Sequence, residues 1–145
     1  MKIWVYLENY RGEITDVSLQ CLEKGRQLAL ETGAVMEAVA LGGDLIRVCR
    51  RAARGGAGSI YRVQDKTLET FVSTLYFHVL KRLLEEHRPE LVLFPASTQG
   101  NDLAPALAGA MQCASVTDCA DVTVEAGSPV CQRLEYDRKA FARYI

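Results

Sequence analysis

Short apolar runs alternate with longer amphipathic patterns along most of this 145-residue chain. A run in which nearly every residue is apolar is typical of a strand buried on both faces. Apolar residues that recur at i, i+3, i+4 and i+7 are typical of a helix with one buried face. This alternation predicts an α/β fold, with a mostly parallel sheet joined by right-handed crossovers. The expected strands cover residues 3–7, 36–41, 60–63 and 91–94, and the expected helices cover residues 16–32, 45–54, 68–87 and 103–111.

Several of the expected helix ends carry a recognisable signal. Asp16 and Asp44 are expected N-caps, because a carboxylate can accept hydrogen bonds from the first-turn N–H groups. Gly33 is expected to end the first helix. Asp102 is expected to cap the last helix, which places Pro105 in the first turn, where its missing N–H costs no helical hydrogen bond.

The pattern changes after Gln112, where only short strands are expected. A turn of the kind that joins a hairpin is expected at residues 127–129, Gly-Ser-Pro. We expect the late strands to add an antiparallel edge to the sheet at its C-terminal end. These strands cover residues 115–117, 121–125, 130–135 and 140–145. One domain accounts for all 145 residues.

The sheet predicts the position of a binding crevice. In open α/β sheets, ligands bind at the carboxyl ends of the strands where the strand order reverses. If the first strand is central, this crevice lies between loops 8–12 and 96–101. The second loop offers hydroxyl groups and N–H groups at a helix start, which suit an anionic or polar ligand. N-cap and turn chemistry alone is the alternative interpretation of this loop. The candidate cofactor-binding residues are Ser97, Thr98, Gly100, Asn101 and Asp102.

Sequence signals of catalysis and of metal binding are absent. The chain has no G-x-G-x-x-G after its first strand, no P-loop motif and no G-x-S-x-G elbow. Its five cysteines contain no C-x-x-C pair, and only two histidines are present. We therefore predict no catalytic residue and no metal site, and we interpret the cysteines as small buried hydrophobic residues. A reactive thiol at Cys113 or Cys119 is the alternative.

The charge balance and the hydropathy limit the partners. Seventeen basic residues against eighteen acidic ones argue against a dedicated nucleic-acid-binding protein. No apolar run approaches the roughly 18 residues of a membrane span. Met1 leads directly into an expected strand, so no signal peptide is recognised and a cytoplasmic protein is predicted.

The second expected helix carries arginines at helical spacing opposite its apolar stripe. Such a face could bind phosphate or an acidic partner. The simpler interpretation is a solvated helix face. The arginines are Arg47, Arg50, Arg51 and Arg54.

Three stretches resemble the N-terminal domain of the electron transfer flavoprotein alpha subunit. Residues 4–8 read Trp-Val-Tyr-Leu-Glu before a short turn and a helix, and residues 56–63 are similar to the family's Gly-Ala-Asp-Lys-Val-Tyr-Val-Val. The most specific stretch begins with the strand at residues 89–94. It continues through Gly-Asn-Asp-Leu-Ala-Pro at 100–105, where the family reads Gly-Arg-Asp-Leu-Ala-Pro, to Val-Thr-Asp at 116–118. The resemblance covers nearly the whole chain.

Three departures from the family pattern stand out. Asn101 replaces the family's arginine, which removes a charge from that position. Residues 136–140 lack the two glycines that the family has there, because Asp137 and Arg138 replace them. Nothing corresponds to the family's second domain, which holds most of the FAD contacts. The chain stops at Ile145 inside an expected strand, which suggests a domain excised from a longer protein.

The resemblance implies a fold and a role. The fold is a three-layer, Rossmann-like domain of the adenine nucleotide alpha hydrolase-like type. The domain is expected to be a non-enzymatic scaffold that pairs with the beta subunit in a heterodimer, which carries electrons from dehydrogenases through FAD. FAD is expected in the assembled complex and little or none on this chain alone, while AMP could occupy the partner or the crevice. An isolated domain would expose its partner-binding surface, which favours self-association.

Two alternatives come from related α/β domains. One is a stand-alone adenine-nucleotide-binding regulator of the universal stress protein class, but its glycine-spaced phosphate loop is missing near the fourth expected strand. The other is an enzyme of the adenine nucleotide hydrolase-like group. Its serine–glycine loop is missing after the first strand, where Glu8, Asn9 and Tyr10 stand instead.

Overall fold

The computed structural model describes residues 1–135 and 140–144. The main sheet contains β1 (Lys2–Tyr6), β4 (Val35–Gly42), β5 (Ser59–Gln64) and β6 (Leu91–Leu93). The helices are α1 (Asp16–Thr32), α2 (Ile46–Arg54), α3 (Ser73–His87) and α4 (Thr98–Met111), with a 3₁₀ turn at Lys66–Leu68. The remaining strands are β2 (Asn9–Tyr10), β3 (Glu13–Ile14), β7 (Cys119–Glu125), β8 (Ser128–Glu135) and β9 (Ala140–Tyr144).

The main sheet has the strand order β5-β4-β1-β6, and every pair in it is parallel. In the central strand β1, Tyr6 is opposite Val39 of β4, and Val5 is opposite Leu93 of β6. The condition set for the crevice, a central first strand, is therefore met, with the second and the fourth expected strands on either side. The strand order reverses at β1, so the carboxyl ends of β1 and β6 flank the predicted crevice.

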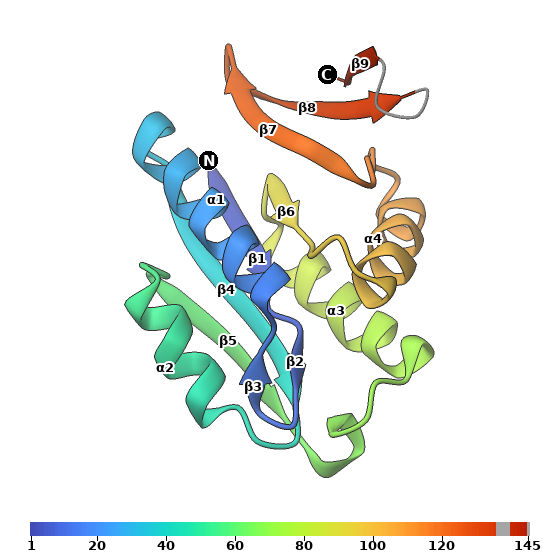
Figure 1. Cartoon of the computed structure of the whole chain (residues 1–145). Helices are drawn as coiled ribbons and strands as arrows, with labels where there is room; N and C mark the ends of the chain where they lie inside the picture. The colour runs from blue at the N-terminus through green and yellow to red at the C-terminus, as the bar shows by residue number, and fades with distance from the viewer. Residues whose placement is uncertain (136–139, 145) are drawn as a thin grey trace.

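Helices cover both faces of this sheet, which gives three layers (Figure 1). The side chains of β1 alternate between the two resulting cores. Ile3 and Val5 pack with residues of α1 and α2, whereas Trp4 and Tyr6 pack with residues of α3 and α4. The three-layer α/β expectation is confirmed, and the apolar character of the strands follows from burial on both faces.

The N-terminal ends of α1 and α2 are capped differently from the expectation. Thr15, and not Asp16, caps α1, and Gly33 ends it with a left-handed φ of 68°. Asp44 accepts a hydrogen bond from the Ile46 N–H at 3.1 Å, although the cap position itself is Leu45.

The longest helix begins at Ser73, and the expected start at residue 68 is wrong. The carbonyl of Leu68 accepts a hydrogen bond from the Tyr76 hydroxyl at 2.6 Å. The preceding turn is closed by Asp65, whose carboxylate accepts from the Thr67 N–H at 2.8 Å. These contacts hold residue 68 in a separate turn, although Leu68 still packs in the core.

The last helix begins five residues earlier than expected. Ser97 is the N-cap of α4, so the prediction that Asp102 caps this helix is wrong. Asp102 lies within the second turn, and Pro105 lies inside the helix. Because proline has no N–H, the carbonyl of Asn101 lacks the usual helical donor at this point.

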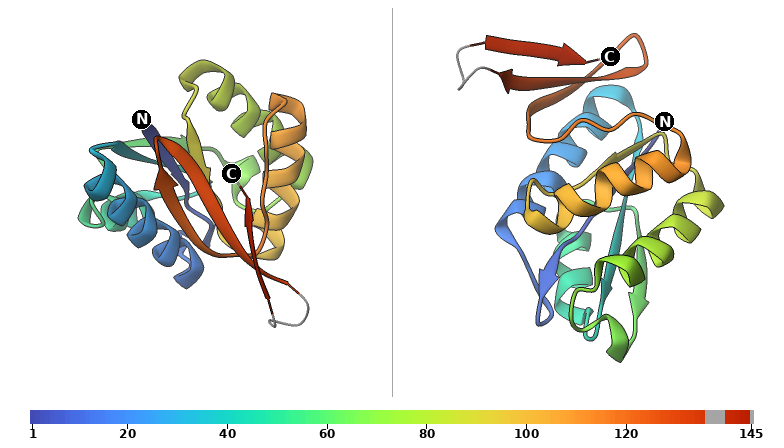
Figure 2. Two further views of the ribbon diagram at one scale, coloured as in Figure 1. Left: turned by 90° about the horizontal axis from the view of Figure 1, so that it is seen from above. Right: turned by 90° about the vertical axis from the view of Figure 1, so that its right-hand side faces the viewer.

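The C-terminal strands form a sheet of their own and do not extend the main sheet. The order is β7-β8-β9, with both pairs antiparallel. Figure 2 shows this sheet projecting beyond the helices and the main sheet. The antiparallel strands are confirmed, but the expectation that they form an edge of the main sheet is wrong. Residues 115–117 are not a strand, residue 145 lies outside the described residues, and so do residues 136–139, where the family's glycines are replaced.

Candidate functional site

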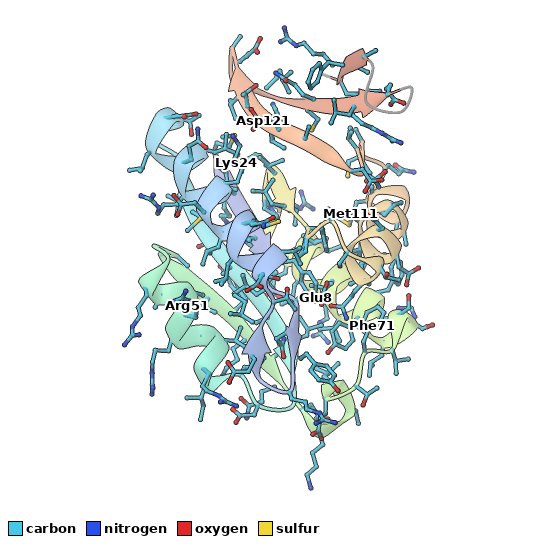
Figure 3. The ribbon with its side chains drawn as sticks, viewed as in Figure 1. Glu8, Lys24, Arg51, Phe71, Met111 and Asp121 are labelled. Carbon is cyan, nitrogen blue, oxygen red and sulfur yellow. The ribbon has the colours of Figure 1, made fainter. Side chains whose placement is uncertain are left out.

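The predicted crevice is closed by contacts between its two loops. The Tyr6 hydroxyl, at the end of β1, donates a hydrogen bond to Oε1 of Gln99 at 2.8 Å. The Ser97 hydroxyl donates to Oε2 of Glu8, which Figure 3 labels near the carboxyl end of β1. The backbone carbonyl of Glu8 accepts from the Ser18 hydroxyl at 3.1 Å and so ties the same loop to α1. The structure therefore brings loops 8–12 and 96–101 together, as the topology predicts.

The first turn of α4 packs very closely on the preceding segment. The Ser97 hydroxyl accepts a hydrogen bond from the Gly100 N–H at 3.0 Å. A Cβ atom at Gly100 would lie only 1.9 Å from the carbonyl oxygen of Pro95, a distance that no real side chain tolerates. Glycine is required here by the close approach of two backbone segments. This requirement explains the glycine without any ligand.

The five candidate residues do not converge on one point. Gly100 is buried and Ser97 is half-buried, and these two are joined by the capping hydrogen bond. Thr98, Asn101 and Asp102 are exposed along α4. Gly100 and Asn101 border a cleft between α1, β6, α4 and β7, whose described lining residues do not include Ser97, Thr98 or Asp102. The cofactor-binding role of the five residues stays a prediction.

The charges in the closed crevice favour the hydrogen bonds that Tyr6 and Glu8 form within the protein. Burial raises the pKa of the Tyr6 hydroxyl well above its usual range, and the nearby Tyr76 and Glu8 add to this effect. Tyr6 therefore stays a hydrogen-bond donor at all physiological pH values. The Glu8 carboxylate meets Ser97 at the positive N-terminal end of α4, where negative charge is stabilised.

Tyr6 and Gln99 were not among the predicted site residues. Tyr6 was counted as part of an apolar run, although a buried tyrosine needs a partner for its hydroxyl. The unpaired hydroxyl of a tyrosine in an apolar run is the sequence signal that identifies Tyr6 as a polar residue of the crevice. Nothing in the sequence indicates that the partner is Gln99.

A second buried polar cluster lies across the α3 face of the sheet. The Trp4 Nε1–H donates to Oε2 of Glu37 at 2.8 Å, and Glu37 is only 8% exposed. The Tyr61 ring lies between its neighbours, with ring centroids 4.7 Å from Trp4 and 4.3 Å from His87. Burial raises the pKa of the Tyr61 hydroxyl, and the Glu37 carboxylate raises it further. The sequence signal for this cluster is a carboxylate, Glu37, inside an otherwise apolar strand.

A cleft with a volume of about 1030 Å³ lies between α1, β6, α4 and β7. It is open along the free edge of β6, the strand that ends the main sheet. Pockets for small ligands typically occupy about 300–1,000 Å³. The cleft is lined by four of the five cysteines, Cys21, Cys113, Cys119 and Cys131.

The cysteines are free and mostly protected. Four are partly buried, but Cys113 is exposed, so the prediction of a buried residue is wrong at that position. Burial raises the pKa of Cys21 to about 11. Burial and the adjacent Cys131 raise the pKa of Cys119 to about 12, which keeps this thiol protonated and unreactive. Among the described residues, no three potential ligands are grouped to hold a metal ion.

An ion pair ties the antiparallel sheet to α1 beside the cleft. The Lys24 Nζ on α1 lies 2.6 Å from Oδ1 of Asp121 on β7, and Figure 3 shows the two residues next to each other. The hydrogen bond from Lys24 lowers the pKa of the Asp121 carboxyl. A lowered pKa adds stability above the carboxyl's unfolded value of about 3.9, and this stability is lost as the pH falls through the folded value.

Asp121→Asn is therefore expected to destabilise the protein at pH 7 by less than about 1 kcal/mol, because both side chains are partly exposed. Urea denaturation should show that the difference from the unmodified protein shrinks toward acid pH. Glu125→Gln is the matched control, since Glu125 pairs with Arg143 within the sheet itself at 2.6 Å. A difference that stayed constant from neutral to acid pH would contradict the assigned role of the pair.

In the part of the chain that the structure describes, no helix has both the length and the apolar character needed to cross a membrane.

Comparison with known proteins gives a consistent result. The family model for the electron transfer flavoprotein domain matches residues 3–145. The chain is 30% identical over 144 residues to the electron transfer flavoprotein subunit alpha of Bacillus subtilis (strain 168), covering 99% of this chain and 44% of the relative.

Two other relatives are similarly distant. The electron transfer flavoprotein subunit alpha of Thermoanaerobacterium thermosaccharolyticum is 27% identical, covering 85% of this chain and 37% of the relative. Protein FixB of Azorhizobium caulinodans is 31% identical, covering 86% of this chain and 34% of the relative. The chain thus spans less than half the length of these curated relatives.

Proposed function

Because the chain belongs to the electron transfer flavoprotein domain family, we propose that it serves as the N-terminal domain of an alpha subunit. In this role it pairs with a beta subunit, and the complex passes electrons from dehydrogenases through FAD. The observation that carries the proposal is the family match over residues 3–145, together with relatives named as alpha subunits along 85–99% of the chain.

The crevice supports a scaffolding role for this domain. Its polar side chains bind one another, through Ser97 with Glu8 and Tyr6 with Gln99. A carboxylate already occupies the N-terminal end of α4, so the negatively charged phosphates of a nucleotide would meet like charge there. The family match and this geometry favour the scaffold over a stand-alone adenine-nucleotide-binding regulator.

The same geometry bears on FAD. The contact of the Glu8 carboxylate with Ser97 would oppose the negative charge of the FAD diphosphate, which supports the proposal that this chain alone binds little or none. The candidate residues Ser97, Thr98, Gly100, Asn101 and Asp102 could then contact FAD, or AMP, only in an assembled complex. Gly100 and Asn101 have the better position for this, since they border the cleft.

The compartment is part of the proposal. All five cysteines are free, although Cys119 and Cys131 lie next to each other. Free thiols persist in reducing compartments. This supports the cytoplasm as the location of the complex.

The test is assembly with the cognate beta subunit. We expect a mixture of the two chains to elute from a size-exclusion column as a heterodimer, with light scattering used to measure its mass. Each chain alone is the control, and the elution of this chain alone also tests self-association. The peak fractions are denatured, and mass spectrometry is used to search for flavin and adenine nucleotide.

We expect this chain alone to release neither flavin nor nucleotide. Failure to form a complex with the beta subunit would overturn the family role of the chain. Stoichiometric FAD released from the isolated chain would leave the family role intact but overturn the scaffold assignment.

A further inference from the structure

One helix face carries a concentration of positive charge that the proposed function does not use. At about 100° per residue, the four arginines of α2 fall within an arc of about 100° on the side opposite its buried stripe. They are exposed, whereas Val48 and Ala52 of the same helix are buried. Figure 3 shows Arg51 on the outer side of the molecule, away from the main sheet. We call this surface the arginine face, made of Arg47, Arg50, Arg51 and Arg54.

The charge of the arginine face is largely uncompensated. Arg47 forms an ion pair with Glu13 of β3. Among the described residues, no carboxylate lies within ion-pair distance of Arg50, Arg51 or Arg54. This positive surface stands out on a chain whose net charge is −1.

Helix stability does not explain the arrangement. Arg51 and Arg54 lie in the last turn, where positive charge is favourable, but Arg47 lies in the first turn, where it is unfavourable. The arginines are also three or four residues apart, and like charges at these spacings repel one another. The ion pair of Arg47 with Glu13 and the hydrogen bond from the Ile46 N–H to Asp44 offset part of this cost. The repulsion among Arg50, Arg51 and Arg54 has no compensating ion pair among the described residues.

The chemistry around the arginines favours a protein partner over a nucleic acid or a membrane. Ile46, next to the arginines on the same helix, is 55% exposed. Arginine beside exposed apolar surface is typical of protein–protein interfaces. The helix carries no aromatic side chain on which a base could stack.

We propose that the arginine face of α2 is a docking surface for a protein whose contacting face carries a cluster of carboxylates. Guanidinium groups bind carboxylates in paired hydrogen bonds, and a helix holds them at fixed spacing. The proposal does not rest on the role of the chain in electron transfer, and a complex with the beta subunit could form whether or not it holds.

The test uses a short fluorescent peptide in which glutamates recur at helical spacing among leucines. Two matched peptides carry glutamine or lysine in place of every glutamate. We expect fluorescence anisotropy to show binding of the glutamate peptide and not of the glutamine peptide. The affinity should fall by roughly tenfold or more from low to moderate salt, because an exposed charged interface is screened.

Charge reversal makes the test specific. Arg50→Glu combined with Arg54→Glu should abolish binding of the glutamate peptide and create binding of the lysine peptide. Arg82→Glu is the matched control, since Arg82 is exposed on α3 in the layer on the other side of the sheet, and it should change neither affinity.

A neutral variant separates binding from folding. Replacing Arg50, Arg51 and Arg54 with glutamine removes the like-charge repulsion and keeps the Arg47–Glu13 ion pair, so the thermal midpoint should stay the same or rise while glutamate-peptide binding is lost. Unchanged binding to this variant would overturn the proposal, as would equal binding of the glutamine peptide. Tighter binding of a single-stranded oligonucleotide or of phosphatidylserine vesicles would overturn the choice of a protein partner.

Discussion

Gly100→Ala is expected to lower the free energy of unfolding by about 3 kcal/mol, which is at the upper end of the range for overpacking. The added Cβ would meet the Pro95 carbonyl oxygen at 1.9 Å, and neither backbone segment can move without breaking other contacts. Moving α4 would disturb the Ser97 cap and the Tyr6–Gln99 hydrogen bond that close the crevice. Urea denaturation followed by the fluorescence of the single tryptophan measures the loss.

Gly109→Ala is the matched control in the same helix. Gly109 is exposed, and a Cβ there would meet nothing within 4 Å. Alanine has the higher helix propensity, so this variant should be more stable by up to about 1 kcal/mol. If both variants changed stability in the same direction, the close approach at Gly100 would not be the determining feature.

Trp4→Phe is expected to destabilise the protein by about 3 kcal/mol. Phenylalanine keeps an aromatic ring in the core but removes the indole N–H that donates to Glu37. The Glu37 carboxylate would then be buried without that donor, and the smaller ring would leave a void beside Tyr61. Circular dichroism is the readout, because the variant lacks the only tryptophan.

A second substitution separates the two contributions. In a Glu37→Leu background no buried carboxylate remains, so Trp4→Phe should cost markedly less there than in the unmodified protein. An equal cost in both backgrounds would mean that the tryptophan contributes through packing alone.

The local patterns of the sequence predict the main sheet and its helices because the burial of each side chain determines whether that residue is apolar. Ile3 and Trp4 face opposite cores, so the whole strand is apolar. The start of α4 was misplaced because Gly100 and Pro105 are usually found outside helices. Here the glycine is required by a tertiary contact with Pro95, which no local pattern contains.

The crevice could be located from topology but not described from sequence. The rule for parallel sheets brings the loops after β1 and β6 together, as observed. The bond between Tyr6 and Gln99 joins residues far apart in the chain, and its geometry depends on the packing of α4. The position of the antiparallel sheet was also not predictable, since hairpin strands pair with each other whether or not they join a larger sheet.

The strand order of the main sheet also sets the order in which a ribosome can complete it. β1 is synthesised before its neighbours, yet it is the strand that ends up between β4 and β6. Ile3 pairs with Met36 early, but its other neighbour, Leu91, emerges only after β5 and α3 have been made. During that interval one edge of β1 stays unpaired in the nascent chain, which gives aggregation or chaperone binding an opportunity there.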